Sequence, residues 1–173
     1  YKNIHDNPHA WNAVKWGGKW HLLDATWGAG YLDGSKFVRR ISTGYFDAPP
    51  AWFAQNHLPD DDKWQLLESP VSKKDFPDQP IVNFGQDEYP LLDFSQKVER
   101  EDRQSVLRFK FSGKPGAFAV VLGKEHSLKF QQEQNDGWVV LRFPSQAAGR
   151  QLTVFAGKSA RSPMGWLARY EVK

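Results

Sequence analysis

Short strand-like segments separated by turn residues fill the second half of the chain, and they restrict its fold more than any other feature. In the segment 107–111, three apolar residues alternate with two basic ones, as in a strand with one buried face. Similar runs lie at 117–122, 128–132, 138–143, 152–156 and 166–173. Turn signals separate them, and no helical pattern interrupts them. These runs predict an immunoglobulin-like antiparallel β-sandwich. Its expected inner face includes Leu107, Phe109, Phe111, Trp166 and Tyr170.

The first part of the chain has a different composition. Six of the 8 tryptophans lie within residues 1–64: Trp11, Trp16, Trp20, Trp27, Trp52 and Trp64. The polar stretch 69–80, which contains three prolines, is typical of a linker because proline removes a hydrogen-bond donor and restricts the residue before it. We therefore predict a first domain at 1–68, a linker at 69–87 and the sandwich domain at 88–173.

Two strand-like runs in the first domain, His9–Trp16 and Lys19–Ala25, are joined by Gly17-Gly18. Glycine accepts the positive φ angles of a two-residue turn, so this pattern predicts a tight antiparallel hairpin. Further along, Asp47 and Pro50 are helix-start signals, with Asp47 as the cap. They predict a short helix that ends before Pro59.

The register of the expected hairpin predicts that a histidine lies next to an acid. With this turn, residues whose numbers add to 35 lie opposite each other, so His9 and Asp24 become diagonal neighbours on one face. Such positions lie about 7–8 Å apart at the backbone, close enough for the side chains to meet. An acid can orient a histidine and stabilise its charged form, as in a nucleophile–His–Asp triad. The alternative is an ordinary polar contact within a sheet.

Other catalytic and metal-binding patterns are weak. The chain has no cysteine, which excludes a thiol nucleophile, a disulfide and a thiolate metal site within these 173 residues. No serine lies in a Gly-x-Ser-x-Gly turn. His5, His9, His21 and Asp24 lack the spacing of a helical metal motif, and the acidic run 60–62 lacks the remainder of a calcium loop. We therefore expect no metal and no cofactor.

Charge and hydropathy exclude two classes of partner. The net charge is +3, and the basic residues after Gly137 are spread along strand-like segments instead of forming a stripe, so no nucleic-acid partner is expected. No apolar run approaches the roughly 18–20 residues of a membrane helix, so no membrane span is expected. The hairpin face that carries His9 presents an apolar strip, for which we expect a cover from a missing segment held as a separate piece, a second copy of the chain or a crystal neighbour. The strip consists of Trp11, Ala13, Trp20 and Leu22.

Two dense motifs resemble a known family. The segments 9–14 and 18–28, which contain His9 and Asp24, are similar to the His and Asp motifs of the transglutaminase-like superfamily. The later segments 45–59 and 64–67 resemble its kyphoscoliosis-peptidase branch, in which a β-sandwich follows the core. The resemblance is strong over about residues 7–68 and rests on architecture beyond them.

The resemblance implies a mainly β (α+β) fold, in which part of a papain/transglutaminase-like core sheet precedes the sandwich. It assigns the triad base to His9 and the triad acid to Asp24, with Trp27 packed nearby. The family's nucleophilic Cys lies upstream of the His motif, and residues 1–7 are too short to hold its helix. We therefore expect this chain to be the C-terminal part of a cysteine peptidase or acyltransferase acting on protein amide bonds, inactive by itself and dependent on a separate Cys-containing segment.

Two alternatives from other classes remain open at this point. A transglutaminase-like protein that has lost catalysis and acts as a scaffold or protein-binding module would share the same motifs. A carbohydrate-binding sandwich would rest only on the aromatic content, most of which is better explained as core.

Overall fold

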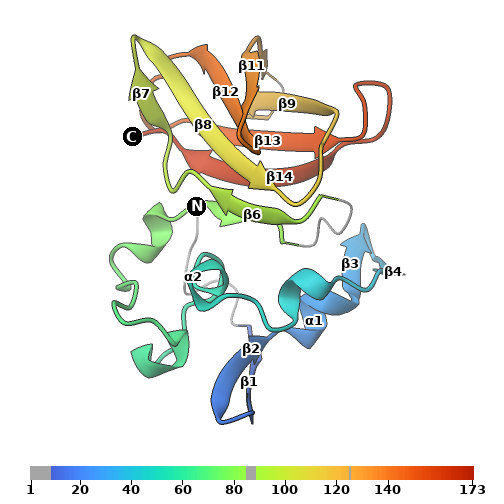
Figure 1. Cartoon of the computed structure of the whole chain (residues 1–173), viewed down its shortest axis with the longest axis vertical. Helices are drawn as coiled ribbons and strands as arrows, with labels where there is room; N and C mark the ends of the chain where they lie inside the picture. Colours follow the sequence, from blue (N-terminus) through green and yellow to red (C-terminus); the bar gives the residue numbers. More distant parts are fainter. Residues whose placement is uncertain (1–8, 85–88, 125) are drawn as a thin grey trace. The chain divides into compact units, whose positions relative to one another are not determined.

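The computed structural model describes residues 9–84, 89–124 and 126–173 (Figure 1). The chain divides into two compact units, Tyr1–Asp78 and Gln79–Lys173. Strands predominate, so the fold is mainly β as expected. No helix among the described residues has the length and hydropathy needed to cross a membrane.

The first unit begins with the predicted hairpin. Strands β1 (Asn12–Trp16) and β2 (Lys19–Leu23) pair antiparallel, with Val14 opposite His21. The register is the expected one, although both strands are shorter than predicted. The turn residues Gly17 and Gly18 have φ angles of 55° and 81°, as a primed two-residue turn requires.

Short elements complete the first unit. The helix α1 (Ala25–Ala29) follows β2 directly, and a second hairpin, which sequence patterns did not indicate, pairs β3 (Gly30–Asp33) with β4 (Lys36–Arg39). The remaining elements are the 3-10 helix η1 (Thr43–Tyr45), α2 (Pro50–Phe53), and the 3-10 helices η2 (Asp62–Gln65) and η3 (Phe76–Asp78).

The expected cap of the short helix was wrong. The N-cap of α2 is Pro49, without a side-chain hydrogen bond. Asp47 lies in the left-handed region at φ 54°, and its carboxylate accepts a hydrogen bond from His21 Nδ1. The helix therefore begins with proline in its first turn, and Asp47 binds His21 instead of capping the helix.

Residues of the first unit itself cover part of the apolar strip on the His9 face of the hairpin. Leu22 is buried with Ala48 and Phe53, and Trp11, Ala13 and Leu66 pack against this cluster. Trp20 stays partly exposed and makes an edge contact with Trp64. Phe53 of α2 and Ala48 of the loop before it thus cover Leu22 from within the chain, and a cover from outside the chain stays a prediction for the more exposed part of the strip.

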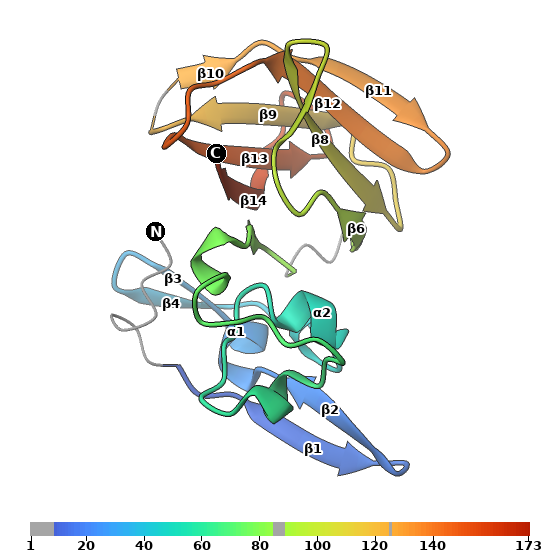
Figure 2. The same cartoon turned by 90° about the vertical axis from the view of Figure 1, so that its left-hand side faces the viewer.

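The second unit is an antiparallel β-sandwich (Figure 2). One sheet has the order β10-β9-β13-β14-β5, with bounds His126–Leu128, Ala117–Leu122, Gln151–Gly157, Gly165–Glu171 and Ile81–Val82. The other has the order β11-β12-β8-β6, with bounds Gln131–Asn135, Trp138–Pro144, Gln104–Phe111 and Leu91–Phe94, and with β7 (Glu99–Glu101) also paired to β8. All these pairs are antiparallel.

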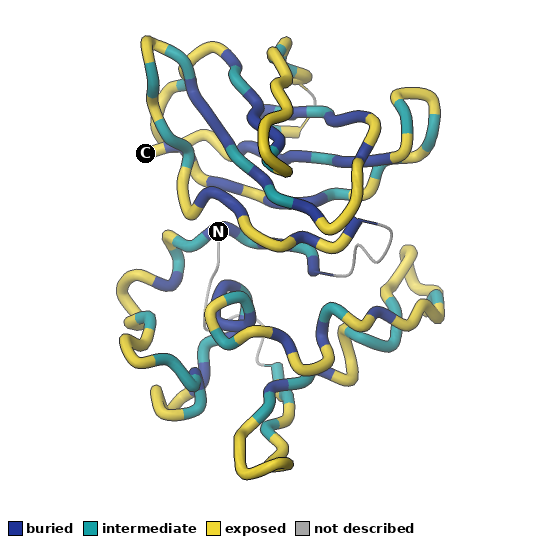
Figure 3. The backbone as a smooth tube through the Cα atoms, in the orientation of Figure 1, coloured by how far each residue is buried: buried dark blue, intermediate teal, exposed yellow. Residues whose placement is uncertain are grey.

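Large apolar side chains from both sheets form the core of the sandwich. Figure 3 shows that buried positions recur along the strands of this unit. Leu107, Phe109, Phe111 and Tyr170 are buried as predicted. The Phe109 ring contacts Tyr170, and the Phe111 ring contacts Phe118, so rings from the two sheets meet. The contact between the inner faces is what joins the sheets into one unit.

Trp166 was wrongly assigned to this core. The pairing of β13 with β14 shifts register between Val154 and Phe155, so that Val154 lies opposite Ala168 while Phe155 lies opposite Trp166. Leu167 is the extra residue of this bulge, and it is fully buried. A bulge reverses the alternation of faces. Trp166 is therefore only half-buried, with the Arg169 guanidinium 5.1 Å from its ring centroid.

The expected single strand over 128–132 is divided between the two sheets. Leu128 pairs with Val120 in one sheet, and Gln131 pairs with Arg142 in the other. The chain crosses from one layer to the other between these pairs, which ends the first strand and starts the second.

Candidate active site

Asp24 occupies the junction between β2 and α1. It is the N-cap of α1, with an extended backbone, and its Oδ1 accepts a hydrogen bond of 2.9 Å from the Trp27 backbone N–H. Its own backbone N–H donates to the carbonyl oxygen of Tyr45. An aspartate that follows a strand and precedes a helix is a preferred cap, because its carboxylate satisfies an otherwise unpaired amide. Local folding therefore fixes this side chain, which is only 1% exposed.

Two histidines contact the other carboxylate oxygen of Asp24. His9 Nε2 lies 2.5 Å from Oδ2, and His57 Nε2 lies 2.9 Å from the same atom. The juxtaposition of His9 and Asp24 expected from the hairpin is present. His57 joins them from the turn that follows α2.

These donors keep the carboxylate ionised. Burial alone would raise the pKa of Asp24, but hydrogen bonds from His57, the Trp27 amide and His9 outweigh it and lower this pKa to about 2. At neutral pH the carboxylate can only accept hydrogen bonds, so both Nε2 atoms must carry hydrogens. Neutral His9 is therefore held as the tautomer whose Nδ1 has a free lone pair for a proton.

Of the two histidines, His9 is the more accessible. Its side chain is 24% exposed, whereas that of His57 is 1% exposed. His57 Nδ1 also lies 3.1 Å from the carbonyl oxygen of Phe53. This oxygen blocks the side of the ring on which Nδ1 could exchange a proton. His57 therefore has no open nitrogen.

Aromatic rings surround both imidazoles. Trp27 stacks on His9 with 4.7 Å between ring centroids, and Phe53 stacks on His57 with 3.8 Å. Trp11 approaches His57 edge-on at 5.0 Å. Trp27 packs near the site as expected and remains 37% exposed, so its outer part is accessible beside His9.

A second His–Asp pair lies on the opposite face of the hairpin. His21 Nδ1 donates to Asp47 Oδ1 at 2.6 Å, and the Trp16 ring stacks on this imidazole. The Asp47 side chain is 50% exposed, whereas the Asp24 side chain is fully buried. A His–Asp contact by itself is thus not distinctive. The His9–Asp24 pair differs in its burial and in the additional donors that hold the acid.

The same residues could also provide metal ligands. The donor atoms of His9, Asp24 and His57 lie within 4.8 Å of one another, and imidazole and carboxylate groups are common ligands of zinc. In the structure, however, both imidazoles are hydrogen-bonded directly to the shared oxygen. A metal ion would have to replace both bonds. The donor set thus fits a hydrogen-bonded cluster better than a metal centre.

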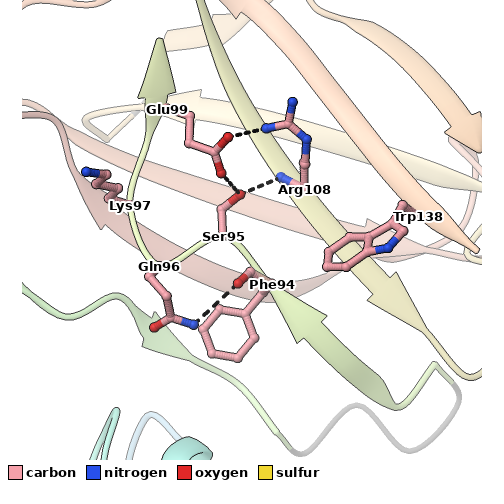
Figure 4. A pocket seen from close by; sticks show the side chains of 7 residues that line it. All are labelled: Phe94, Ser95, Gln96, Lys97, Glu99, Arg108 and Trp138. Carbon is pink, nitrogen blue, oxygen red and sulfur yellow. Dashed lines mark hydrogen bonds and ion pairs between the residues drawn. The ribbon is translucent and has the colours of Figure 1, made fainter. Parts of the chain in front are cut away.

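The sandwich carries a pocket of about 340 Å³ near β6, β7 and Trp138 (Figure 4). Its polar groups bind one another: Ser95 Oγ donates to Glu99 and accepts from the Arg108 backbone N–H, and the Arg108 guanidinium also pairs with Glu99. These interactions pair Ser95, Glu99 and Arg108 with one another, so the carboxylate that lines the pocket is already bound to an arginine. We take the His9–Asp24–His57 cluster as the candidate active site, because it combines a buried carboxylate with two imidazoles in direct contact with it.

His57 was not identified from the sequence. It lies 33 positions from Asp24, and no local spacing or strand alternation connects the two residues. The available signal was the resemblance of the segment 45–59, which contains His57, to the kyphoscoliosis-peptidase branch. That signal places a segment but not a particular side chain.

Comparison with known proteins finds relatives of this chain. The chain is 49% identical over 70 residues to kyphoscoliosis peptidase of Mus musculus and equally to that of Homo sapiens, which covers 39% of this chain and 11% of each relative. It is related to the kyphoscoliosis peptidases. The chain is also 26% identical to the Lim and transglutaminase domain protein of Caenorhabditis elegans over 164 residues. This match covers 85% of the chain and 22% of that protein. The transglutaminase-like relationship indicated by the two motifs is thus confirmed.

The chain is short compared with these relatives, since it spans about a tenth of the length of the kyphoscoliosis peptidases. Hillarin of Drosophila melanogaster, 29% identical over 86 residues, is likewise covered over 10% of its length. No protein-family model and no solved structure matches the chain significantly.

Proposed function

We propose that this chain supplies the base and the orienting acid of a transglutaminase-like cysteine peptidase or acyltransferase that acts on protein amide bonds. His9 is the base, and Asp24 is the acid. The observation that supports this most directly is the buried carboxylate of Asp24, which holds His9 by Nε2 and leaves Nδ1 available. The relationship to kyphoscoliosis peptidase and to a transglutaminase domain protein agrees with this chemistry.

The reaction proceeds through a thioester. His9 Nδ1 takes the proton of a cysteine thiol, and the thiolate sulfur forms a bond to the carbonyl carbon of a substrate amide. The C–N bond then breaks, and the proton on Nδ1 goes to the leaving amine. Water or a second amine next attacks the thioester carbon while Nδ1 accepts its proton, and the C–S bond breaks, which releases a carboxylic acid or a new amide and leaves a thiolate. Transfer of that proton back to sulfur restores the thiol.

Asp24 and Trp27 assist His9 in this scheme. When His9 is protonated, the ionised carboxylate stabilises its positive charge and keeps the ring in one orientation. The stacked Trp27 ring covers one face of the imidazole, which restricts the access of water to the hydrogen bond with Asp24.

The thiol must come from outside these 173 residues, because they contain no cysteine. We propose that it lies on a further segment that meets the accessible side of His9. By this proposal the chain alone neither hydrolyses peptides nor transfers acyl groups.

A thiol-alkylation experiment tests the role of His9. In a form of the protein that includes the proposed cysteine segment, iodoacetamide should alkylate the thiol rapidly near pH 6, because His9 removes its proton. His9→Ala should slow alkylation at this pH and restore it only towards the usual thiol pKa of about 8.5. Turnover of an amide substrate should fall by at least about 100-fold.

The matched control is His126→Ala, which removes an exposed histidine of the second unit and should leave both rates unchanged. Equal alkylation by the His9 variant and the unmodified protein would rule out His9 as the base and would favour the non-catalytic scaffold. Amide turnover by the 173-residue chain alone would contradict the thiol mechanism.

A further inference from the structure

We propose that His57 is a positioning residue, which holds the carboxylate of Asp24 in the orientation that His9 requires. This inference rests on the proposed roles of His9 and Asp24. It assigns a function to a second histidine that the two sequence motifs do not contain.

His57 is itself held firmly. Its ring stacks on Phe53 at an interplanar angle of 16°, and its Nδ1 lies against the carbonyl oxygen of the same residue. The backbone N–H of His57 also donates to this oxygen. Trp11 closes a further side, and the side chain is 1% exposed. The imidazole therefore has little freedom to rotate, and its Nε2 is directed at Asp24.

His57 and the Trp27 amide together fix the carboxylate plane. The Trp27 N–H holds Oδ1, and His57 holds Oδ2. Two donors on different oxygens determine how the carboxylate is rotated, whether or not His9 is in contact. His9 then meets an acceptor that is already oriented, so its own hydrogen bond does not have to reorient the acid.

Packing alone does not account for His57. A phenylalanine could fill the space between Phe53 and Trp11, but it would leave a buried carboxylate oxygen without one of its donors. Burial raises the pKa of Asp24, and the bond from His57 is the largest of the contributions that lower it. The polar contact, and not the ring volume, is therefore what the site requires.

His57→Gln and His57→Asn form a matched pair that tests this contact. Both variants replace the imidazole with an amide. The Gln amide nitrogen lies close to the position of Nε2 and can still donate to Asp24, whereas the Asn amide is too short and reaches only the position of Nδ1. A purely structural role for the imidazole would affect both variants alike.

The measurement is a ¹³C NMR titration of the Asp24 carboxyl in the 173-residue chain. The carboxyl pKa should rise in the Asn variant and stay close to that of the unmodified chain in the Gln variant. In the cysteine-containing form, thiol alkylation near pH 6 should be slowed by His57→Asn and rescued by His57→Gln. Equal titration of Asp24 in both variants would overturn the positioning role.

A measurement on the unmodified chain does not depend on how the variants fold. A long-range ¹⁵N–¹H spectrum at pH 7 should show a hydrogen on His57 Nε2, and its absence would also overturn the proposal. Failure of the two proposals can be told apart. If His9→Ala leaves alkylation unchanged, the triad proposal fails. If His9 matters but the two His57 variants are alike, only the positioning role fails.

Discussion

At the scale of single residues, Asp24 has two tasks. Its Oδ1 caps α1, and its Oδ2 accepts from two imidazoles. The cap is a local consequence of an aspartate between strand and helix. The imidazole contacts depend on residues far apart in the sequence. One buried carboxylate thus combines a folding role with the proposed catalytic one.

The low pKa of Asp24 predicts a specific acid sensitivity. A native pKa of about 2, below the usual 3.8, means that the ionised carboxylate stabilises the fold above about pH 4 and that this stabilisation is lost as the pH falls towards 2. The loss should amount to about 2 kcal/mol. Asp24→Asn should lack this part of the pH dependence.

Urea denaturation at pH 7, 4 and 2.5 measures the effect. The other carboxylates titrate in both proteins, so the difference between the pH profiles of the unmodified chain and Asp24→Asn reports on Asp24 together with the two histidines that contact it. Parallel pH profiles for the two proteins would show that Asp24 is not held as described.

At the scale of elements, the β1–β2 turn positions the site, because its register brings His9 beside Asp24. A one-residue slip would move one of these side chains to the other face of the sheet. Both turn glycines have positive φ, and a Cβ atom on either would meet no neighbour within 4 Å. Substitution here therefore tests backbone conformation without steric interference.

Gly18→Val should destabilise the first unit by about 1–2 kcal/mol, because a branched residue is strained at positive φ. Gly17→Asn, the matched control, should cost much less, since Asn-Gly is a favoured sequence for this turn. Chemical denaturation followed by tryptophan fluorescence compares the two. Equal stability of Gly18→Val and the unmodified chain would contradict the turn geometry.

Elements whose determinants are local in the sequence were predictable. The hairpin register followed from Gly17-Gly18, and the long strands followed from alternation. The bulge at Leu167 was not predictable, because it depends on how β14 pairs with β13, and it moved Trp166 out of the core. Short strands such as Ile81–Val82 contain too few residues to show a period. His57 required the tertiary fold, since α2 brings it to Asp24.

At the scale of the whole molecule, each unit has its own hydrophobic core. In the first, α2 packs on the hairpin through Phe53 and Leu22. In the second, the inner faces of two sheets meet. The proposed chemistry uses residues of the first unit only, so substitutions in the sandwich core should act through stability.

Two leucines in the sandwich provide a matched test. Leu141 is fully buried, and Leu92 is 46% exposed. Leu141→Ala should lower the unfolding free energy of this unit by about 2–5 kcal/mol, because it removes buried methyl groups and leaves a cavity. Leu92→Ala should change it by less than about 0.5 kcal/mol. Urea denaturation monitored by circular dichroism measures both, and equal effects would contradict the assigned inner and outer faces.

The double role of Asp24 has a consequence for evolution within this group of proteins. A mutation that abolished catalysis elsewhere, for example at the nucleophile, would not release Asp24 from selection, because the start of α1 would still need its cap. The aspartate should therefore persist in lineages that have become inactive, while the thiol, which has no such structural task in the proposed scheme, is free to change. In a survey of relatives, loss of the cysteine should mark inactive members, and Asp24 should be retained in both groups.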